Sequence, residues 1–495
     1  MMKMMQKHNL TIKKLATIFV VLIAILSMGV VPSAQACTRL LYQQTIDSKP
    51  ITGRSMDWFE FPDTKLWFFE KGIQRNGKAG DNSVEWKSKY DSIVNASYDL
   101  AMVDGINDQG LVVNLLVLAS TNYGQPGGNK KNISLGGWGQ YVLDNYKNVD
   151  ETVACLTKNI PSSKKELGKA TTCPTGVKDT PLHIVTANLG QLKDAGVIGD
   201  IPLSNDFNLS LHMALSDKTG NSAILEYVEG KLVVHQNKDY DVLTNDPIFE
   251  EQRAINTYWY NLYKPQILCE GLAGLSQSIP VPPVGFLPGS TNASDRFVRA
   301  KYYLDKMEEP NQEKIASMII QQCGKPLDST PPPSGAPIYD TSPKAAAPLS
   351  DDEARRNELA GVLGIVRNAS DPIGLAITPD LSNPADLPAI IARLGTTQWR
   401  TVSNQDEDDL SYYFEYTRSP NVIWASMKDL QESTIDPEKK AKVLESSKID
   451  LGSGKNKGLD HVVLVGNVSD QFKDKIPFDW NICTINTTAP ECQTN

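Results

Sequence analysis

Residues 33–43, SAQACTRLLYQ, come directly after an apolar run and bear on where the folded chain begins. Lysines precede the run LATIFVVLIAILSMGVV, and Ala34-Gln35-Ala36 supplies a small-x-small triplet of the kind that signal peptidase cuts. We therefore expect residues 1–36 to be a removed export signal, which makes Cys37 the first residue of a periplasmic or secreted protein. The alternatives are a retained membrane anchor, since the run is close to the roughly 17 residues needed to span a bilayer, and a lipoprotein acylated on Cys37.

Composition limits the partners of the remaining chain. Of 495 residues, 49 are basic and 58 acidic, and no basic tract interleaved with aromatic residues occurs, so nucleic acid is not an expected partner. After the export signal, the best apolar run is GLVVNLLVLA at 110–119, which has the length of a strand. We therefore expect no membrane association once the signal is removed.

Seven cysteines remain after the expected cut. In an oxidising compartment an odd number implies one free thiol, and the other six can pair in any of 15 connectivities. We predict Cys37 as the free thiol. Because each pair brackets one polar loop segment, we predict these bridges: Cys155–Cys173, Cys269–Cys323 and Cys483–Cys492. Neither C-x-x-C nor H-x-x-x-H occurs, so no metal site is expected.

The order of expected elements indicates an α+β fold rather than regular βαβ units. Short strands broken by turn residues are expected at 38–44, 50–58 and 65–72, and an antiparallel meander at 209–236. Helical periodicity follows the meander, for example at 296–307. Residues 324–350 are rich in Pro, Ser and Ala and predict a loop, and the polar chain beyond about residue 431 predicts an appended tail.

A cysteine at a new N-terminus carries its own base. The α-amino group has an ordinary pKa of about 7.7 to 8.0, so near neutral pH it can accept the thiol proton. Such a site also needs a cation to stabilise the thiolate, a carboxylate to hold the amine, and donors for an oxyanion. The candidates are Arg54 and Asp57 in GRSMDW, Asn245 in DVLTNDPIF, and Arg296 at the start of the expected helix.

Taken in order along the chain, these segments resemble the choloylglycine hydrolase family. These are linear amide C–N hydrolases of the N-terminal nucleophile superfamily and include penicillin V acylases and bile-salt hydrolases. The segments that carry the resemblance are CTRLLYQ, ITGRSMDW, VDGINDQGL, GWGQYVLDN, LHMALSDKTGNSAILEY, VLTNDPIF, LPGSTNASDRFVRA, IVRNAS and WRTVSN. Exported members from Gram-negative bacteria share SMDW, WxQYxLDN and DRFVRA and are the most similar subgroup.

The resemblance implies a four-layer αββα sandwich over residues 37–431. Relative to the family, insertions are expected near 155–175, 260–285 and 311–350, and a C-terminal extension over 432–495. It further implies a tetramer in some members and no cofactor.

The resemblance also assigns roles to single residues. Cys37 corresponds to the nucleophile, Arg54 and Asp57 to the pair that flanks it, Asn245 to the side-chain oxyanion donor, and Arg296 to a second active-site arginine. Many bile-salt hydrolases have Asn or Tyr where this chain has Val117, whose backbone N–H can still donate to an oxyanion.

The expected activity is therefore that of an acylase that uses Cys37 on penicillin V-like or N-acyl homoserine lactone-like amides. Bile-salt hydrolysis is one alternative, and a non-catalytic exported binding protein on the same scaffold is another. Trp58 and Trp138 are candidates for lining an acyl or aryl pocket, with core packing as the alternative for both.

Overall fold

The structure is a computed structural model, and it describes part of the chain. The described residues are 37–43, 49–157, 173, 181–200, 204–263, 287–307, 350–370, 396–417, 419, 421–445 and 464–493, with the backbone of 165–166, 266–267 and 280–281. The expected export signal, most of the three expected insertions, and the pair Cys269 and Cys323 lie outside the described residues.

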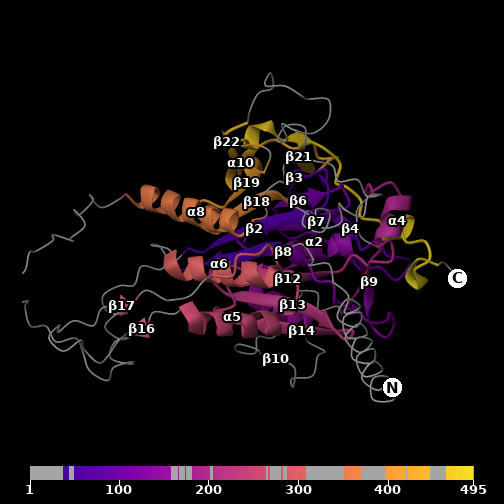
Figure 1. Ribbon diagram of the computed structural model, residues 1–495. Coiled ribbons are helices and arrows are strands. Elements are labelled where there is room, and N and C mark those ends of the chain that lie inside the picture. The colour runs from indigo at the N-terminus through magenta and orange to yellow at the C-terminus, as the bar shows by residue number, and fades with distance from the viewer. Residues whose placement is uncertain are drawn as a thin grey trace, which may run out of the picture.

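Two large sheets dominate the described residues (Figure 1). In spatial order, the smaller sheet contains β15 (Val242–Thr244), β1 (Thr38–Tyr42), β2 (Ile51–Trp58), β18 (Thr396–Asn404), β19 (Ser411–Tyr416), β20 (Val422–Ser426) and β22 (Gly466–Asn467). The larger sheet contains β10 (Lys165–Glu166), β14 (Lys231–Gln236), β13 (Ser222–Val228), β12 (Leu211–Ser216), β8 (Val112–Val117), β7 (Ala101–Asn107), β6 (Ser92–Ser97), β3 (Lys65–Phe69), β21 (Ala441–Leu444) and β23 (Lys473–Asp474). Neighbouring strands are antiparallel except β20–β22 and β10–β14.

Helices cover the outer faces of the two sheets. The helices are α2 (Leu135–Asn145), α3 (Val149–Leu156), α4 (Leu189–Asp194), α5 (Phe249–Tyr263), α6 (Ala293–Met307), α8 (Asp351–Asn368) and α10 (Met427–Glu432). Helix α2 packs on β7 and β8 of the larger sheet. In the smaller sheet, α6 packs on β1 and β15, and α8 packs on β1, β2 and β18. The expected αββα order of layers is therefore confirmed.

Smaller elements complete the described fold. They are the parallel pair β9 (Lys131–Ser134) and β11 (Leu182–Val185), the hairpin β4 (Gln74–Asn76) and β5 (Glu85–Lys87), the pair β16 (Gln266–Ile267) and β17 (Pro280–Val281), and the 3-10 turns Ser469–Gln471, Ile482–Thr484 and Pro490–Cys492. None of the helices that the structure describes has the length and apolar character needed to cross a bilayer.

The central strands are buried on both faces, because each sheet lies between the other sheet and a helical layer. The six residues of β8, VVNLLV, are an almost continuous apolar run for this reason. One core cluster joins the two sheets and continues to α6 and α8, and a second joins the larger sheet to α2 and α3. Glycine at position 53 of β2 lets α8 come close, since a Cβ there would lie 2.7 Å from a methyl carbon of Val366.

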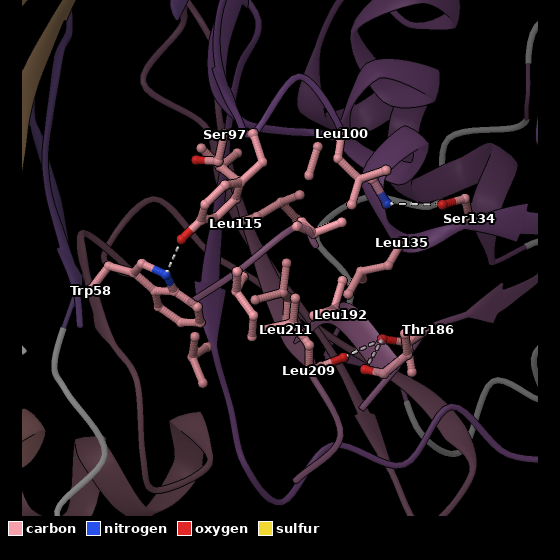
Figure 2. Close-up of a pocket in the computed structure, with 18 of the residues that line it drawn as sticks. Trp58, Ser97, Leu100, Leu115, Ser134, Leu135, Thr186, Leu192, Leu209 and Leu211 are labelled. Atoms are coloured by element: carbon pink, nitrogen blue, oxygen red, sulfur yellow. Dashed lines mark hydrogen bonds between the residues drawn. The ribbon is translucent and has the colours of Figure 1, made fainter. Parts of the chain in front are cut away.

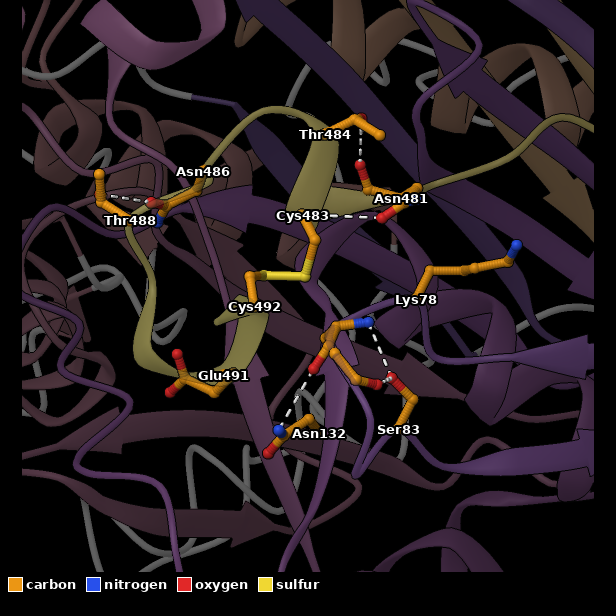
Figure 3. Close-up of a disulfide and its surroundings, with 12 residues drawn as sticks. Lys78, Ser83, Asn132, Asn481, Cys483, Thr484, Asn486, Thr488, Glu491 and Cys492 are labelled. Carbon is orange, nitrogen blue, oxygen red and sulfur yellow. Dashed lines mark hydrogen bonds between the residues drawn. A yellow bond between two sulfur atoms is a disulfide. The ribbon is translucent and has the colours of Figure 1, made fainter. Parts of the chain in front are cut away.

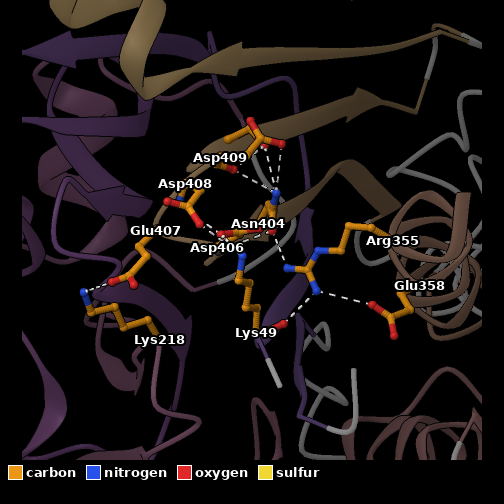
Figure 4. Close-up of polar contacts among 10 residues, drawn as sticks. Lys49, Lys218, Arg355, Glu358, Asn404, Asp406, Glu407, Asp408 and Asp409 are labelled. Carbon is orange, nitrogen blue, oxygen red and sulfur yellow. Dashed lines mark hydrogen bonds and ion pairs between the residues drawn. The ribbon is translucent and has the colours of Figure 1, made fainter. Parts of the chain in front are cut away.

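Helix α8 is also tied to the ends of the strands beneath it (Figure 4). The Nη1 of Arg355 donates to the backbone oxygen of Lys49 at 2.7 Å, just before β2, and Nη2 donates to Asn404, the last residue of β18. The Nζ of Lys49 lies 2.7 Å from a carboxylate oxygen of Asp406 in the following loop. These contacts fix the helix across β2 and β18.

The chain beyond residue 431 is part of the fold rather than an appendage. Strand β21 pairs with β3 and with β23 in the larger sheet, and β22 pairs with β20 in the smaller one. The indole of Trp480 stacks on that of Trp86 at 6.0 Å between ring centroids. The sequence does not predict β21, because an apolar stretch as short as its four residues, AKVL, does not stand out in a polar segment.

The cysteine predictions are confirmed where the structure describes the residues. Disulfides join Cys155 to Cys173 and Cys483 to Cys492, and Cys37 is a buried free cysteine.

Candidate active site

Strand pairing brings distant residues to Cys37. In β1, Thr38 pairs with Thr244 of β15 on one side and with Ser55 of β2 on the other. Because both pairings are antiparallel, the residue before Thr38 lies next to the residues that follow Thr244 and Ser55. Cys37 is thereby placed beside Asn245 and Met56, at the end of an inner strand as expected.

The thiol of Cys37 is enclosed. Its Sγ lies 3.8 Å from the Sδ of Met56 and 3.9 Å from the backbone oxygen of Asp57, and the residue is 1% exposed. Burial raises the pKa of the Cys37 thiol, and the charge of Arg54 opposes that effect. Burial therefore favours the neutral thiol, and the nearby cation favours the thiolate.

Arg54 supplies this cation from the face of β2 that looks toward the larger sheet. Its guanidinium donates to the backbone oxygens of Val103 and Leu115, and its Nη1 lies 3.7 Å from a carboxylate oxygen of Asp104. Burial raises the pKa of Asp104 to about 6, although Arg54 acts to lower it. The guanidinium is thus fixed by strands of the opposite sheet.

Asp57 lies on the opposite face of β2, because alternate residues of a strand point to opposite faces. Its Oδ2 accepts a hydrogen bond from Nη1 of Arg296 in α6, and its Oδ1 accepts one from Thr397 at 2.6 Å. Burial raises the pKa of Asp57, and Arg296 opposes this shift. Arg54 and Asp57 therefore flank Cys37 from two sides, and both are buried, which rules out a surface ion pair.

Asn245 begins the turn between β15 and α5. Its side chain is buried, and its Oδ1 has no hydrogen-bond partner within the described residues. The Nε2 of Gln252 in α5 donates to the backbone oxygens of Asn245 at 3.0 Å and Pro247 at 2.6 Å. The Oε1 of the same side chain accepts from the backbone N–H of Thr244 at 3.0 Å. The buried side chain of Gln252 therefore fixes the backbone of the turn at three residues.

Cys37 is one of the residues that line an apolar pocket, and Figure 2 shows other side chains of this lining. The residues that line it are Cys37, Arg54, Met56, Trp58, Ser97, Tyr98, Leu100, Ala101, Val103, Leu115, Val117, Ser134, Leu135, Gly136, Thr186, Ala187, Leu192, Val197, Ile198, Leu209, Leu211 and Ile482. Arg54 is the one charged side chain in this described lining. A pocket of this kind suits an apolar group of a ligand that reaches Cys37.

The two candidate tryptophans have different places. Trp58 lines the pocket, and its Nε1 donates to the hydroxyl of Tyr98 at 2.7 Å, a bond drawn in Figure 2. Trp138 packs edge-on against Tyr123 and Tyr227 in the second core cluster and is not part of the lining. Trp138 therefore packs in the core, which is the alternative to lining the pocket.

Val117 lines the pocket at the end of β8. The pairing of β8 with β7 runs from Val112 to Asn114 and so stops before Val117. On its other side Val117 pairs with Leu211 of β12. The backbone at Val117 is therefore at the pocket edge, where an N–H can face a ligand.

Sequence reasoning missed several residues that build the site. Met56 and Asp104 stand inside the motifs GRSMDW and VDGINDQGL, but nothing in the pattern distinguishes them. Thr397 and Gln252 carry no sequence signal, since their contacts depend on tertiary pairing. The described residues contain no group of three or more His, Cys, Asp or Glu arranged to hold a metal ion.

Comparison with known proteins finds relatives of this chain. Residues 37–341 match the sequence model described as linear amide C–N hydrolases, choloylglycine hydrolase family. A penicillin V acylase of Pectobacterium atrosepticum is 31% identical over 485 residues, which cover 96% of this chain and 99% of that protein. A bile salt hydrolase/transferase of Clostridium perfringens is 35% identical over 130 residues, covering 25% of this chain and 38% of that protein.

A solved structure is also similar. The structure of penicillin V acylase from Agrobacterium tumefaciens matches with a TM-score of 0.57 and 30% identity, and the match covers 90% of this chain and 99% of that chain.

Proposed function

The chain belongs to the choloylglycine hydrolase family of linear amide C–N hydrolases, and we propose that it cleaves acyl amides with Cys37 as an N-terminal nucleophile. The observation that carries the proposal is the place of Cys37. It is a buried free thiol at the base of an apolar pocket, within reach of Arg54, at the residue where the family match begins.

In the proposed reaction, the α-amino group of Cys37 takes the proton from Sγ. The thiolate then attacks the carbonyl carbon of the amide, and the carbonyl oxygen becomes an oxyanion held by the Asn245 side chain and the Val117 backbone N–H. The C–N bond breaks, the proton goes to the leaving amine, and a thioester remains on Sγ. Water hydrolyses the thioester to release the acid and restore the thiol.

Arg54 and Asp57 have supporting roles in this proposal. Arg54 stabilises the thiolate, because a buried thiol beside a cation ionises more readily than one without it. Asp57, paired with Arg296, fixes the end of β2 whose backbone oxygen contacts Sγ. Trp58 contributes an aromatic wall to the pocket beside the nucleophile.

The proposed substrates are penicillin V-like or N-acyl homoserine lactone-like amides. The apolar lining favours a substrate with an apolar acyl group, and the near full-length similarity is to a penicillin V acylase. Conjugated bile salts are the alternative substrate, given the shorter similarity to a bile salt hydrolase/transferase. A binding protein without turnover is the alternative outside enzymology.

We further propose that residues 1–36 direct export and are removed. Two described disulfides are compatible with an oxidising compartment, where such bonds persist. The cut has a second effect in this proposal, because it creates the free amine that serves as the base. Assembly into a tetramer remains a prediction from the resemblance.

Intact mass of the active protein tests the mechanism directly. The expected mass is that of a chain that begins at Cys37, and an active chain that keeps any earlier residue contradicts the mechanism. Lipid mass on Cys37 would also contradict it, since acylation of the amine removes the base.

Substitution and a substrate panel complete the test. Cys37→Ala should abolish acyl release with little change in melting temperature, and retained activity would reject the nucleophile. Hydrolysis of penicillin V, N-acyl homoserine lactones and glycine-conjugated bile salts, measured side by side, decides the substrate class. No hydrolysis of any of them, together with a Cys37 that iodoacetamide does not alkylate at neutral pH, would favour the binding protein.

A further inference from the structure

The pocket connects two separate apolar clusters. Cys37, Met56 and Trp58 belong to the cluster between the sheets, whereas Ala187, Leu192, Ile198 and Ile482 belong to a smaller cluster around α4. All seven line the pocket. The side chains of Tyr98 and Leu209 pack against both clusters. The pocket therefore has a reactive end at Cys37 and a distant end at the α4 cluster.

The distant end includes a residue from the C-terminal segment, defined here as residues 480–493. Ile482 is 5% exposed, and its side chain lines the pocket together with Leu192 and Ile198. Figure 2 draws and labels the side chain of Leu192. Arg54 is the charged group of the described lining and lies at the reactive end, whereas Ile482, Leu192 and Ile198 offer an acyl chain apolar side chains.

The C-terminal segment is held firmly in this place (Figure 3). The Cys483–Cys492 disulfide closes a short loop directly after Ile482, and the backbone N–H of Ile482 donates to the oxygen of Lys78 at 3.1 Å. At the other end of the loop, a carboxylate oxygen of Glu491 lies 2.8 Å from Nε2 of the buried His183.

Other contacts tie the same loop to the pocket wall. The Nδ2 of Asn486 donates to the backbone oxygen of Thr186 at 2.9 Å, and Thr186 itself lines the pocket. The Nε2 of Gln191 in α4 donates to Oδ1 of Asn486 at 2.7 Å. The segment and the α4 wall are therefore one connected unit.

We propose that the disulfide-closed C-terminal segment forms the end wall of the acyl pocket, and that Ile482 sets the length of the acyl chain the enzyme accepts. This inference rests on the proposed amide hydrolysis and adds its specificity-determining residue. A fixed wall is needed for this role, because a side chain on a loose loop yields to a longer substrate and cannot discriminate by length.

The test uses the mature protein and amides of one amine with straight acyl chains from butanoyl to tetradecanoyl. Ile482→Ala should move the peak of kcat/KM to longer chains, with a gain of about fourfold for each additional methylene buried. Ile482→Trp should move the peak to shorter chains. Cys483→Ser combined with Cys492→Ser should flatten the profile while leaving the preferred chain hydrolysed.

The matched control is Ile485→Ala. Ile485 packs against the same α4 cluster from the same segment but does not line the pocket, so its loss should lower stability without moving the peak. An equal shift in Ile485→Ala, or an unchanged peak in folded Ile482→Ala, overturns the inference. If Ile482→Ala does not fold, Ile482→Val provides the same comparison, with a shift of one methylene expected and no shift contradicting the proposal.

Binding separates this inference from the proposed function. Calorimetry with free straight-chain carboxylic acids reports pocket length without turnover. If no amide is hydrolysed but acid binding shifts to longer chains in Ile482→Ala, the proposed function fails and the end wall stands. If amides are hydrolysed with the same chain-length profile in wild type and Ile482→Ala, the proposed function stands and the end wall is contradicted.

Discussion

Arg296 and Asp57 form a buried ion pair across 239 residues of chain, with Nη1 of the arginine donating to Oδ2 of the carboxylate. Both side chains are at most 1% exposed. The pair joins α6 to the strand that carries Arg54 and contacts the Cys37 thiol. The ion pair therefore connects the outer helix α6, through β2, to the candidate nucleophile Cys37.

Removal of one partner of this pair should be strongly destabilising. Arg296→Met leaves Asp57 as a buried carboxylate without its cation, and we expect the free energy of unfolding to fall by about 3–5 kcal/mol in urea denaturation. Arg296→Met combined with Asp57→Asn should recover part of this loss. The control is the surface pair Lys193–Asp200, where Lys193→Ala should change the free energy of unfolding very little, because exposed ion pairs are weak. Equal losses at the two pairs would contradict the burial argument.

Arg54→Met should raise the pKa of the Cys37 thiol. The cation favours the thiolate, so its removal moves the pH profile of iodoacetamide alkylation to higher pH and lowers the rate at pH 7, by roughly tenfold for the loss of an adjacent charge. Arg400→Met is the control, because Arg400 acts on Asp57 and Glu415 rather than on the thiol. An unshifted profile in Arg54→Met would remove Arg54 from the proposed mechanism.

Gln252→Ala should lower kcat more than it raises KM. The glutamine holds the turn that begins at Asn245, and loss of an oxyanion donor costs about 10²–10³ in kcat, so a misplaced donor should cost about tenfold or more. Asn245→Ala combined with Gln252→Ala should lower kcat little more than Asn245→Ala alone, because both changes act on the same contact with the oxyanion.

Gln140→Ala is the matched control for Gln252→Ala. Gln140 is equally buried, but it lies in α2 and its Nε2 donates to Ser92 and Asp144. This variant should lose stability without a specific loss of kcat. Additive effects of the Asn245 and Gln252 changes would show that Gln252 does not act through Asn245.

Glu226 makes the free energy of unfolding depend on pH in the acidic range. Hydrogen bonds from His212 and His235 outweigh its burial and lower its pKa from 4.5 to about 2 in the folded protein. The folded state thus keeps the carboxylate ionised where the unfolded chain protonates it, so this contribution is fully present above pH 4.5 and is lost as the pH falls toward 2. It amounts to about 3 kcal/mol.

Urea denaturation of wild type and Glu226→Gln at several pH values measures the contribution of Glu226 to the free energy of unfolding. The variant should be less stable at pH 7, and the difference should shrink as the pH falls from 4.5 toward 2. A difference that stays constant over this range would show that Glu226 acts through packing alone.

The local pattern of the sequence was sufficient for several elements of the fold. The meander at 209–236 is the antiparallel series β12, β13 and β14, and the periodic segment at 296–307 lies within α6. Both depend on short-range alternation or periodicity, which the sequence carries directly.

The assembly of the site depends on pairings that spacing does not reveal. Asn245 reaches Cys37 because β15 pairs with β1, and Gln252 holds the turn from a helix whose periodicity does not distinguish it from other polar residues. Trp138 illustrates the same limit, since an apolar position on a helix predicts burial but not whether a pocket or a core receives the side chain. The chemical needs of a cysteine nucleophile indicate the candidate residues, and the resemblance to a family assigns a role to each of them.

Cys37 and Ile482 line one pocket although 445 residues separate them in the chain. Proteolytic removal of residues 480–493 would leave the thiol of Cys37 in the remaining chain but would take away a residue of the pocket lining. Clipping of this segment should therefore be recognised by weaker acyl binding in a protein whose thiol content is unchanged.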